Sequence, residues 1–160
     1  MIHLVLSAIL VLGRFMADAP AYKTYHNARF GFSIDYPVTL QPQPEADNGD
    51  GRRFVSADGQ TSLAAYAGYD VLDGGLAQYR QLARRHWQEK KATLALDQKL
   101  TTGFVLSGRL GRDIFYEKTV LRAGTLTTFV WQYPAARKEA MDAVILHTIR
   151  SFQPSSTGSQ

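Results

Sequence analysis

The 160-residue chain contains no cysteine. This absence excludes structural disulfides, every kind of thiol chemistry, and the lipid-modified cysteine that anchors bacterial lipoproteins. The sequence also lacks an apolar run that could cross a bilayer, because the longest one, residues 4–13, has only about ten residues. We therefore expect neither a lipid anchor nor a transmembrane anchor.

The short apolar run at the start suits the central region of a secretory signal peptide. The segment Ala17-Asp18-Ala19-Pro20-Ala21 follows it, and Ala19 with Ala21 satisfies the small-x-small rule for cleavage after Ala21. We predict a signal peptide over residues 1–21 and a periplasmic or secreted mature protein. The alternatives are a misassigned start codon and an N-terminal helix packed on the domain.

No catalytic signature is present. The mature chain offers only His26, His86 and His147 as imidazoles, and none lies in a nucleophile elbow or beside a serine signature. Structural roles for these histidines are favoured, so we predict no catalytic residues and a protein that is not an enzyme. The alternative is an unrecognised hydrolase, in which one histidine must reach a serine or a carboxylate.

Metal and phosphate motifs are absent as well. In the loop after Pro44, an EF-hand counted from Asp47 would have Gly49 and Gly51 where oxygen ligands are required. The segment Gly108-Arg109-Leu110-Gly111 lacks the lysine and the following helix of a phosphate-binding loop. We predict no metal site and no cofactor.

What the sequence does contain is enough apolar material for one core. Hydrophobic residues make up 45% of the chain, and the formal net charge is +4. This size predicts a single domain, and the mild basicity only weakly favours acidic partners. The clearest element is 30–37, a period-2 strand that ends at a proline. Its bulky side chains share one face and are predicted to be buried: Phe30, Phe32, Ile34 and Tyr36.

The remaining pattern predicts strands at 53–57, 61–69, 101–107, 113–121 and 125–133, and helices from residue 76 to about 94 and from 134 to about 152. Small residues such as Ala64 and Gly68 recur in the second of these strands, so a bulky element should pack close to it. The order β-β-β-α-β-β-β-α predicts an α+β fold in which an antiparallel sheet carries two helices. We expect one domain over 22–153 and a disordered tail over 154–160.

This layout resembles the PsbP-like superfamily, which includes an extrinsic photosystem II subunit and DcrB-type bacterial envelope proteins. The resemblance covers about residues 22–153. It is carried by four features: the aromatic-Gly-aromatic strand ending at Tyr36-Pro37, the long helix after a small-residue strand, Tyr116-Glu117-Lys118 within a meander, and the closing helix after Tyr133-Pro134. The resemblance implies an α/β/α sandwich used for binding or assembly, without a site that transfers residue by residue.

The helix predicted from residue 76 has a basic face. Trp87 adjoins it on the apolar side, and the cationic residues on the face are Arg80, Arg84, Arg85 and Lys91. These five residues are the candidate partner-binding surface, because arginine can pair with carboxylates or phosphates. Candidate partners are an acidic protein, anionic lipid or an anionic envelope polymer, whereas nucleic acid is not expected. The simpler interpretation is a solvated helix face.

Aromatic residues form the second candidate site. In the last strand Phe129, Trp131 and Tyr133 share one face, and we predict that they line an open groove. The opposite face carries Leu126, Thr128, Val130 and Gln132. The favoured function is a non-enzymatic, exported adapter of the bacterial envelope that acts through protein–protein contacts. The alternative is a carrier that holds a small apolar or lipid ligand between sheet and helix.

Overall fold

The computed structural model describes residues 20–155, so the predicted signal peptide lies outside the described residues except for Pro20 and Ala21. The described chain is rich in strands. These are β1 (Tyr22–His26), β2 (Ser33–Pro37), β3 (Leu40–Pro42), β4 (Gly51–Ser56), β5 (Ser62–Tyr69), β6 (Thr93–Lys99), β7 (Gly103–Leu110), β8 (Asp113–Arg122) and β9 (Thr125–Pro134). The helices are α1 (Gly75–Glu89), the short 3₁₀ turn η1 (Ala135–Arg137) and α2 (Lys138–Ser151).

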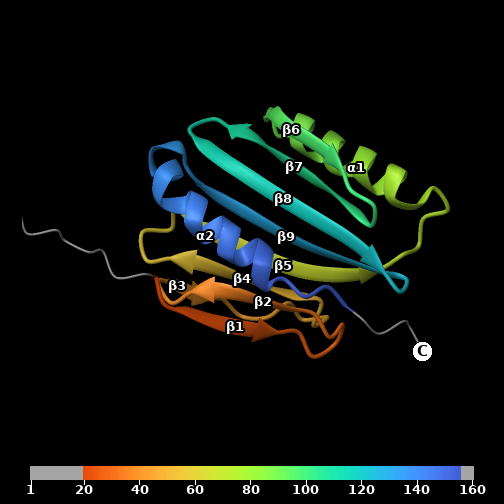
Figure 1. Cartoon of the computed structure of the whole chain (residues 1–160), viewed down its shortest axis with the longest axis horizontal. Helices are drawn as coiled ribbons and strands as arrows, with labels where there is room; N and C mark the ends of the chain where they lie inside the picture. Colours follow the sequence, from red (N-terminus) through yellow and green to blue (C-terminus); the bar gives the residue numbers. More distant parts are fainter. Residues whose placement is uncertain (1–19, 156–160) are drawn as a thin grey trace, which may run out of the picture.

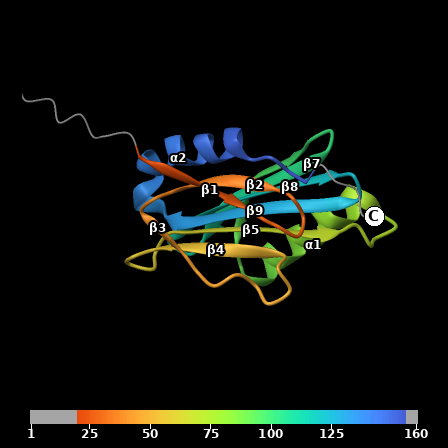
Figure 2. The same ribbon diagram turned by 90° about the horizontal axis from the view of Figure 1, so that it is seen from below.

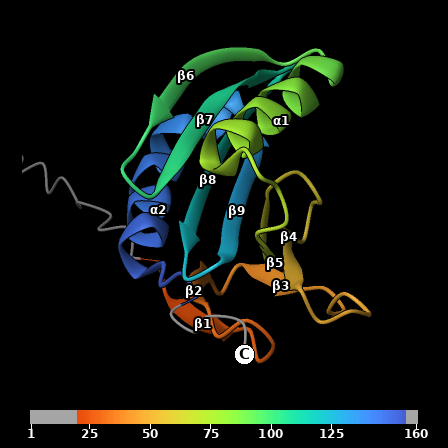
Figure 3. The ribbon, with the colours of Figure 1, turned by 90° about the vertical axis from the view of Figure 1, so that its right-hand side faces the viewer.

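Seven strands form one antiparallel sheet in the order β3-β4-β5-β9-β8-β7-β6 (Figure 1). The strands β1 and β2 form a separate antiparallel hairpin. Figure 2 shows α2 and this hairpin on one side of the sheet, and Figure 3 shows α1 on the other. The predicted α+β fold, an antiparallel sheet between two helices, is confirmed.

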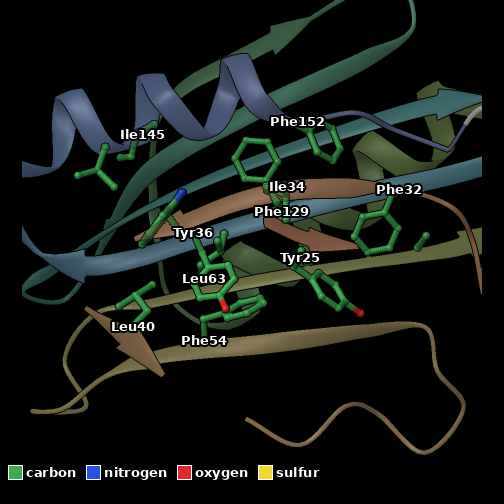
Figure 4. Packing of buried hydrophobic residues seen from close by; sticks show 14 of the residues in the cluster. Tyr25, Phe32, Ile34, Tyr36, Leu40, Phe54, Leu63, Phe129, Ile145 and Phe152 are labelled. Carbon is green, nitrogen blue, oxygen red and sulfur yellow. The ribbon is translucent and has the colours of Figure 1, made fainter. Parts of the chain in front are cut away.

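The larger core lies between the sheet, α2 and the hairpin (Figure 4). Its side chains come from alternate positions of each strand, as the pleat requires. Ile34, Leu63, Phe129 and Trp131 are completely buried in it. Contacts between aromatic rings connect the layers. For example, Phe129 and Phe152 make an edge-to-face contact with ring centroids 5.0 Å apart.

A smaller core lies under α1. Trp87 stacks on Phe115 of β8 with ring centroids 3.7 Å apart, and Phe104 and Leu106 of β7 complete the cluster. Because α1 packs against β6 and β7, it covers only one half of its sheet face. This difference between the two faces creates the groove described below.

Two sequence expectations need correction. The run 30–37 is buried as predicted, but β2 begins at Ser33, because Gly31 has a φ of 69°, and β2 belongs to the hairpin, not to the large sheet. The helix predicted to reach about residue 94 ends at Glu89, where Lys91 adopts a left-handed φ of 61°. The residues that follow form β6, an edge strand that the helical period concealed.

The C-terminal segment after α2 is fastened across the hairpin. Gln153 pairs with Ser33, and the Ser155 hydroxyl donates to the carbonyl of Phe30 at 2.5 Å. The packed chain thus extends to Ser155, two residues beyond the predicted domain end, and the rest of the predicted tail lies outside the described residues. Within residues 20–155, no helix is long and apolar enough to cross a membrane.

Candidate binding groove

The groove lies between α1 and the half of the sheet that α1 leaves uncovered. Figure 3 shows the helix and the sheet that border it. It has a volume of about 730 Å³, within the range of about 300–1,000 Å³ typical of ligand pockets. Its floor comes from β5, β8 and β9, and one wall comes from α1. The aromatic and aliphatic residues that line it include Tyr66, Tyr69, Tyr79, Leu82, Trp87, Phe104, Leu126 and Val130.

Small side chains on β5 make the floor accessible. Ser62, Ala64 and Gly68 line the groove, and a Cβ placed on Gly68 would meet no heavy atom within 4 Å. The sequence predicted that a bulky element would pack against this strand. Within the described chain no helix or strand fills that space above Gly68, so the small residues form the floor of a groove instead.

The α1 wall follows from helical periodicity. Tyr79, Ala83, His86, Trp87 and Lys90 line the groove, and their spacing of three and four residues places them on one side of a helix. The Tyr79 hydroxyl accepts hydrogen bonds from the backbone N–H groups of Val71 at 2.9 Å and Leu72 at 3.2 Å. The loop before α1 is thereby fixed to the helix, with the Tyr79 ring at the groove.

A buried carboxyl group lies where α1 meets the groove floor. Glu117 of β8 is only 6% exposed, and its Oε2 accepts a hydrogen bond from Trp87 Nε1 at 2.6 Å. Burial raises the pKa of Glu117, while hydrogen bonds from Trp87 and Thr119 lower it. The net direction is upward, so Glu117 takes up a proton more readily than an exposed glutamate does.

A phenol and two hydroxyls surround this carboxyl group. The Oγ1 atoms of Thr119 and Thr128 are hydrogen-bonded at 2.8 Å. Although 42% of Tyr66 is exposed, its hydroxyl is hydrogen-bonded to Thr128. Burial, together with the charge of Glu117, raises the pKa of Tyr66, which keeps the phenol protonated. The groove therefore presents hydrogen-bonding groups among apolar walls.

The predicted basic helix face is divided by the fold. Asp97 of β6 engages Arg80 at 2.6 Å and Arg84 at 3.2 Å, so these two arginines stabilise the packing of α1 on the edge strand. Arg85 and Lys91 are exposed, and neither has an ion-pair partner among residues 20–155. Trp87 is buried and faces Glu117 instead of solvent. Partner binding through this helix stays a prediction, carried by Arg85 and Lys91.

The predicted aromatic groove lies on the wrong face of β9. Phe129, Trp131 and Tyr133 are at most 3% exposed and belong to the core beneath α2 and the hairpin. The open face of the same strand is the other one, which contributes Leu126, Thr128, Val130 and Gln132 to the groove. The sequence pattern correctly predicted which residues of this strand share a face. Large aromatic side chains are preferentially buried, so the smaller residues of β9 line the groove.

The histidines do not assemble a nucleophilic site. His147 Nε2 lies 2.8 Å from Asp35 Oδ2, and the His147 ring stacks on Tyr22 with centroids 3.6 Å apart. The nearby Ser151 hydroxyl donates to the carbonyl of Thr148 and accepts the N–H of Asp35, so it is not positioned as a nucleophile for His147. His26 and His86 are exposed.

Acidic residues are not gathered for a metal either. Across the described range, no group of three or more His, Cys, Asp or Glu side chains is placed to hold a metal ion. In the loop after Pro44, Asn48 Nδ2 donates a hydrogen bond to Asp50 Oδ2 at 2.9 Å. Asp58 instead pairs with Arg137 at the other end of β4.

The layered sheet and its half-covered face define a PsbP-like fold. The solution structure of cyanobacterial PsbP (CyanoP) from Synechocystis sp. PCC 6803 is similar over 93% of this chain and 98% of that chain, with a TM-score of 0.64 and 13% identity. A crystal structure from Bacteroides thetaiotaomicron VPI-5482 matches 81% of this chain and 47% of that chain, with a TM-score of 0.47 and 14% identity. No family model and no curated protein matches the sequence. The resemblance drawn from the sequence is thus confirmed for the fold.

Proposed function

We propose that the protein is a non-enzymatic binding protein that carries a small amphipathic molecule in the groove between α1 and the open half of the sheet. The observation that carries this proposal is the groove itself, about 730 Å³ in volume, with aromatic walls and a buried carboxyl group. Ligand sites typically combine apolar walls with a few converging polar groups. A carboxyl group whose pKa is raised by burial is a further mark of such sites.

A binding role also agrees with the residues that are missing. Among residues 20–155, the one histidine–aspartate pair has no aligned nucleophile, and no metal cluster is present. The fold is shared with cyanobacterial PsbP, a likeness that says nothing about ligand identity. We place the protein in the bacterial envelope because of the predicted signal peptide.

The test uses a variant that fills the groove without touching the core. Gly68→Phe adds a large side chain where an added Cβ meets no atom within 4 Å. Gln98→Phe adds the same side chain at an exposed position of β6 outside the groove and serves as the control. Binding of N-phenyl-1-naphthylamine, a neutral fluorescent probe, is titrated for each protein.

We expect saturable binding to the wild type and to Gln98→Phe, and its loss in Gly68→Phe with unchanged circular dichroism. Native mass spectrometry of protein purified without detergent gives an independent reading, as a bound mass in the wild type that Gly68→Phe lacks. Failure of the probe to bind, or equal binding by all three proteins, would contradict the proposal.

Protein–protein contact is the second candidate, and exposed apolar residues at the groove mouth favour it. Val71 is 78% exposed and Tyr69 45% exposed, next to one end of the groove. A pull-down from the envelope fraction of the source organism compares the wild type with Val71→Asp and with Arg85→Glu/Lys91→Glu. These two cations are chosen because reversing Arg80 or Arg84 would also break their pairs with Asp97. If both variants still capture a partner that the wild type captures, neither the apolar residues at the groove mouth nor the two cations of α1 bind that partner.

A further inference from the structure

A second cavity, of about 680 Å³, adjoins the groove at one end. Arg53, Ser62 and Gln132 line both spaces, so the two cavities are adjacent at these side chains. The second cavity is bordered by the turn between β4 and β5, the turn between β7 and β8, and the segment after β9. One end of a ligand in the groove would therefore lie beside it.

The second cavity is positively charged. Arg53, Arg109 and Arg112 line it, against a single acid, Asp113. Asp113 accepts a hydrogen bond from Gln132 Nε2 at 3.0 Å. None of the three arginines has an ion-pair partner within the described chain, and the Arg53 guanidinium donates a long hydrogen bond to the Ser62 hydroxyl, at 3.4 Å. Unpaired guanidinium groups at a cavity are suited to carboxylates and phosphates, which they bind in a planar, two-pronged geometry.

The groove proper has a different charge pattern. Its charged residues are mixed in sign, with Asp50 and Glu117 opposing Arg53 and Lys90. Strand register places Arg53 and Glu117 in one row across β4, β5, β9 and β8, so three strand spacings, about 14 Å, separate their backbones. An acidic ligand group would be repelled near Glu117 and attracted at the arginines. This charge pattern would orient a bound molecule with its acidic group toward the arginines.

The groove floor is also elongated. Ser62 and Gly68 lie at its two ends along β5, a distance of about 20 Å at the rise of an extended strand. The end opposite the arginines is apolar, with Gly68, Tyr69, Leu82 and Leu126 lining it. This shape favours an extended chain over a compact ligand.

We infer that the occupant is a single-chain anionic amphiphile whose apolar chain lies along β5 and whose acidic head group binds at Arg53, Arg109 and Arg112. The inference rests on the proposed function, because it assigns the ligand class of the same groove. A carboxylate and a phosphate monoester share the chemistry that the arginines recognise, and the test includes one of each.

The experiment compares dodecanoate, dodecyl phosphate and dodecanol, which share one alkyl chain, by displacement of N-phenyl-1-naphthylamine. For the wild type we expect at least one acid to bind about tenfold more tightly than the alcohol, the ratio that one charge-assisted hydrogen bond supplies. Arg53→Gln/Arg112→Gln should lose that preference while keeping its affinity for dodecanol. The matched control is Arg85→Gln/Arg122→Gln, which removes the same charge at exposed positions outside both cavities.

The outcomes separate this inference from the proposed function. Equal affinity for the alcohol and both acids, or equal loss of preference in the two double variants, overturns the anionic ligand and leaves the groove as a binding site. If the probe itself does not bind, the proposed function fails first. A preference for one acid over the other identifies the head group as carboxylate or phosphate.

Discussion

The two faces of the seven-stranded sheet are built from the same strands but differ in what covers them. On β9, Phe129 and Trp131 point to the face that α2 and the hairpin cover, and both are completely buried there. Thr128 and Val130 point to the other face, where they line the groove beside α1. One face is a packed core, and the other combines a small core with a groove. A single strand can thus supply stability on one side and a binding surface on the other.

The largest expected effect on stability comes from truncating one residue on each face. Phe129→Ala removes a completely buried ring and should lower the free energy of unfolding by about 3–5 kcal/mol. Leu82→Ala, at a half-exposed position on the groove wall, should change it by about 0.5 kcal/mol or less. Urea unfolding followed by circular dichroism measures both. Similar losses for the two variants would mean that the groove is closed and packed.

The next test concerns the two tryptophans, one on each face. Trp87→Phe preserves an aromatic ring against Phe115 but removes the N–H that bonds Glu117. Removing this donor from a buried carboxyl group should cost about 1–3 kcal/mol. Trp131→Phe is the comparison, since Trp131 Nε1 has no hydrogen-bond partner among residues 20–155. Urea unfolding should show the larger loss for Trp87→Phe, and the reverse order would contradict the role given to the Glu117 contact.

The third prediction concerns how Glu117 contributes to the pH dependence of stability. Because the folded-state pKa of Glu117 is raised above the ordinary 4.5, the unfolded chain loses this proton first as pH rises. Burial of Glu117 therefore destabilises the fold progressively from about pH 4.5 up to the folded-state pKa, and by a constant amount above it. Glu117→Gln should gain stability relative to the wild type across that window.

The measurement is thermal unfolding at about pH 4 and about pH 8. Glu139→Gln on α2, an exposed position, is the control and should show no such gain. A difference between Glu117→Gln and the wild type that stays constant with pH would show that Glu117 titrates normally.

The smallest effect is expected at the groove floor. Gly68→Ala places a methyl group in open space and should be neutral, or stabilising by up to about 1 kcal/mol through the unfolded chain. Urea unfolding against the wild type measures it. A clear loss of stability would mean that another part of the protein occupies the space above β5. This outcome would contradict the proposal that a ligand binds in the groove.

The sequence was sufficient to predict which residues of each strand share a face. Phe30, Phe32, Ile34 and Tyr36 are all buried as their alternation indicates, because the pleat fixes the direction of each side chain locally. It was not sufficient to predict which face remains open. That depends on where α1 and α2 pack, which is decided by contacts between segments far apart in the chain.

The site residues illustrate the same limit. Glu117 is one acid within a strand, and its burial depends on Trp87, 30 residues earlier. Gly68 did give a local signal, since small residues in a strand indicate a close neighbour or a space; only the structure distinguishes the two. The end of α1 was missed because lysine rarely adopts the left-handed conformation found at Lys91.

The C-terminal segment across the hairpin has a consequence for biosynthesis. Gln153 pairs with Ser33, and Ser155 bonds Phe30, contacts that span 120 and 125 positions of the sequence. The β1–β2 hairpin therefore gains these neighbours only after residues 153–155 have been synthesised. Contacts of such high sequence separation slow folding. We expect the nascent hairpin to remain incompletely packed until this segment is available to pair with it.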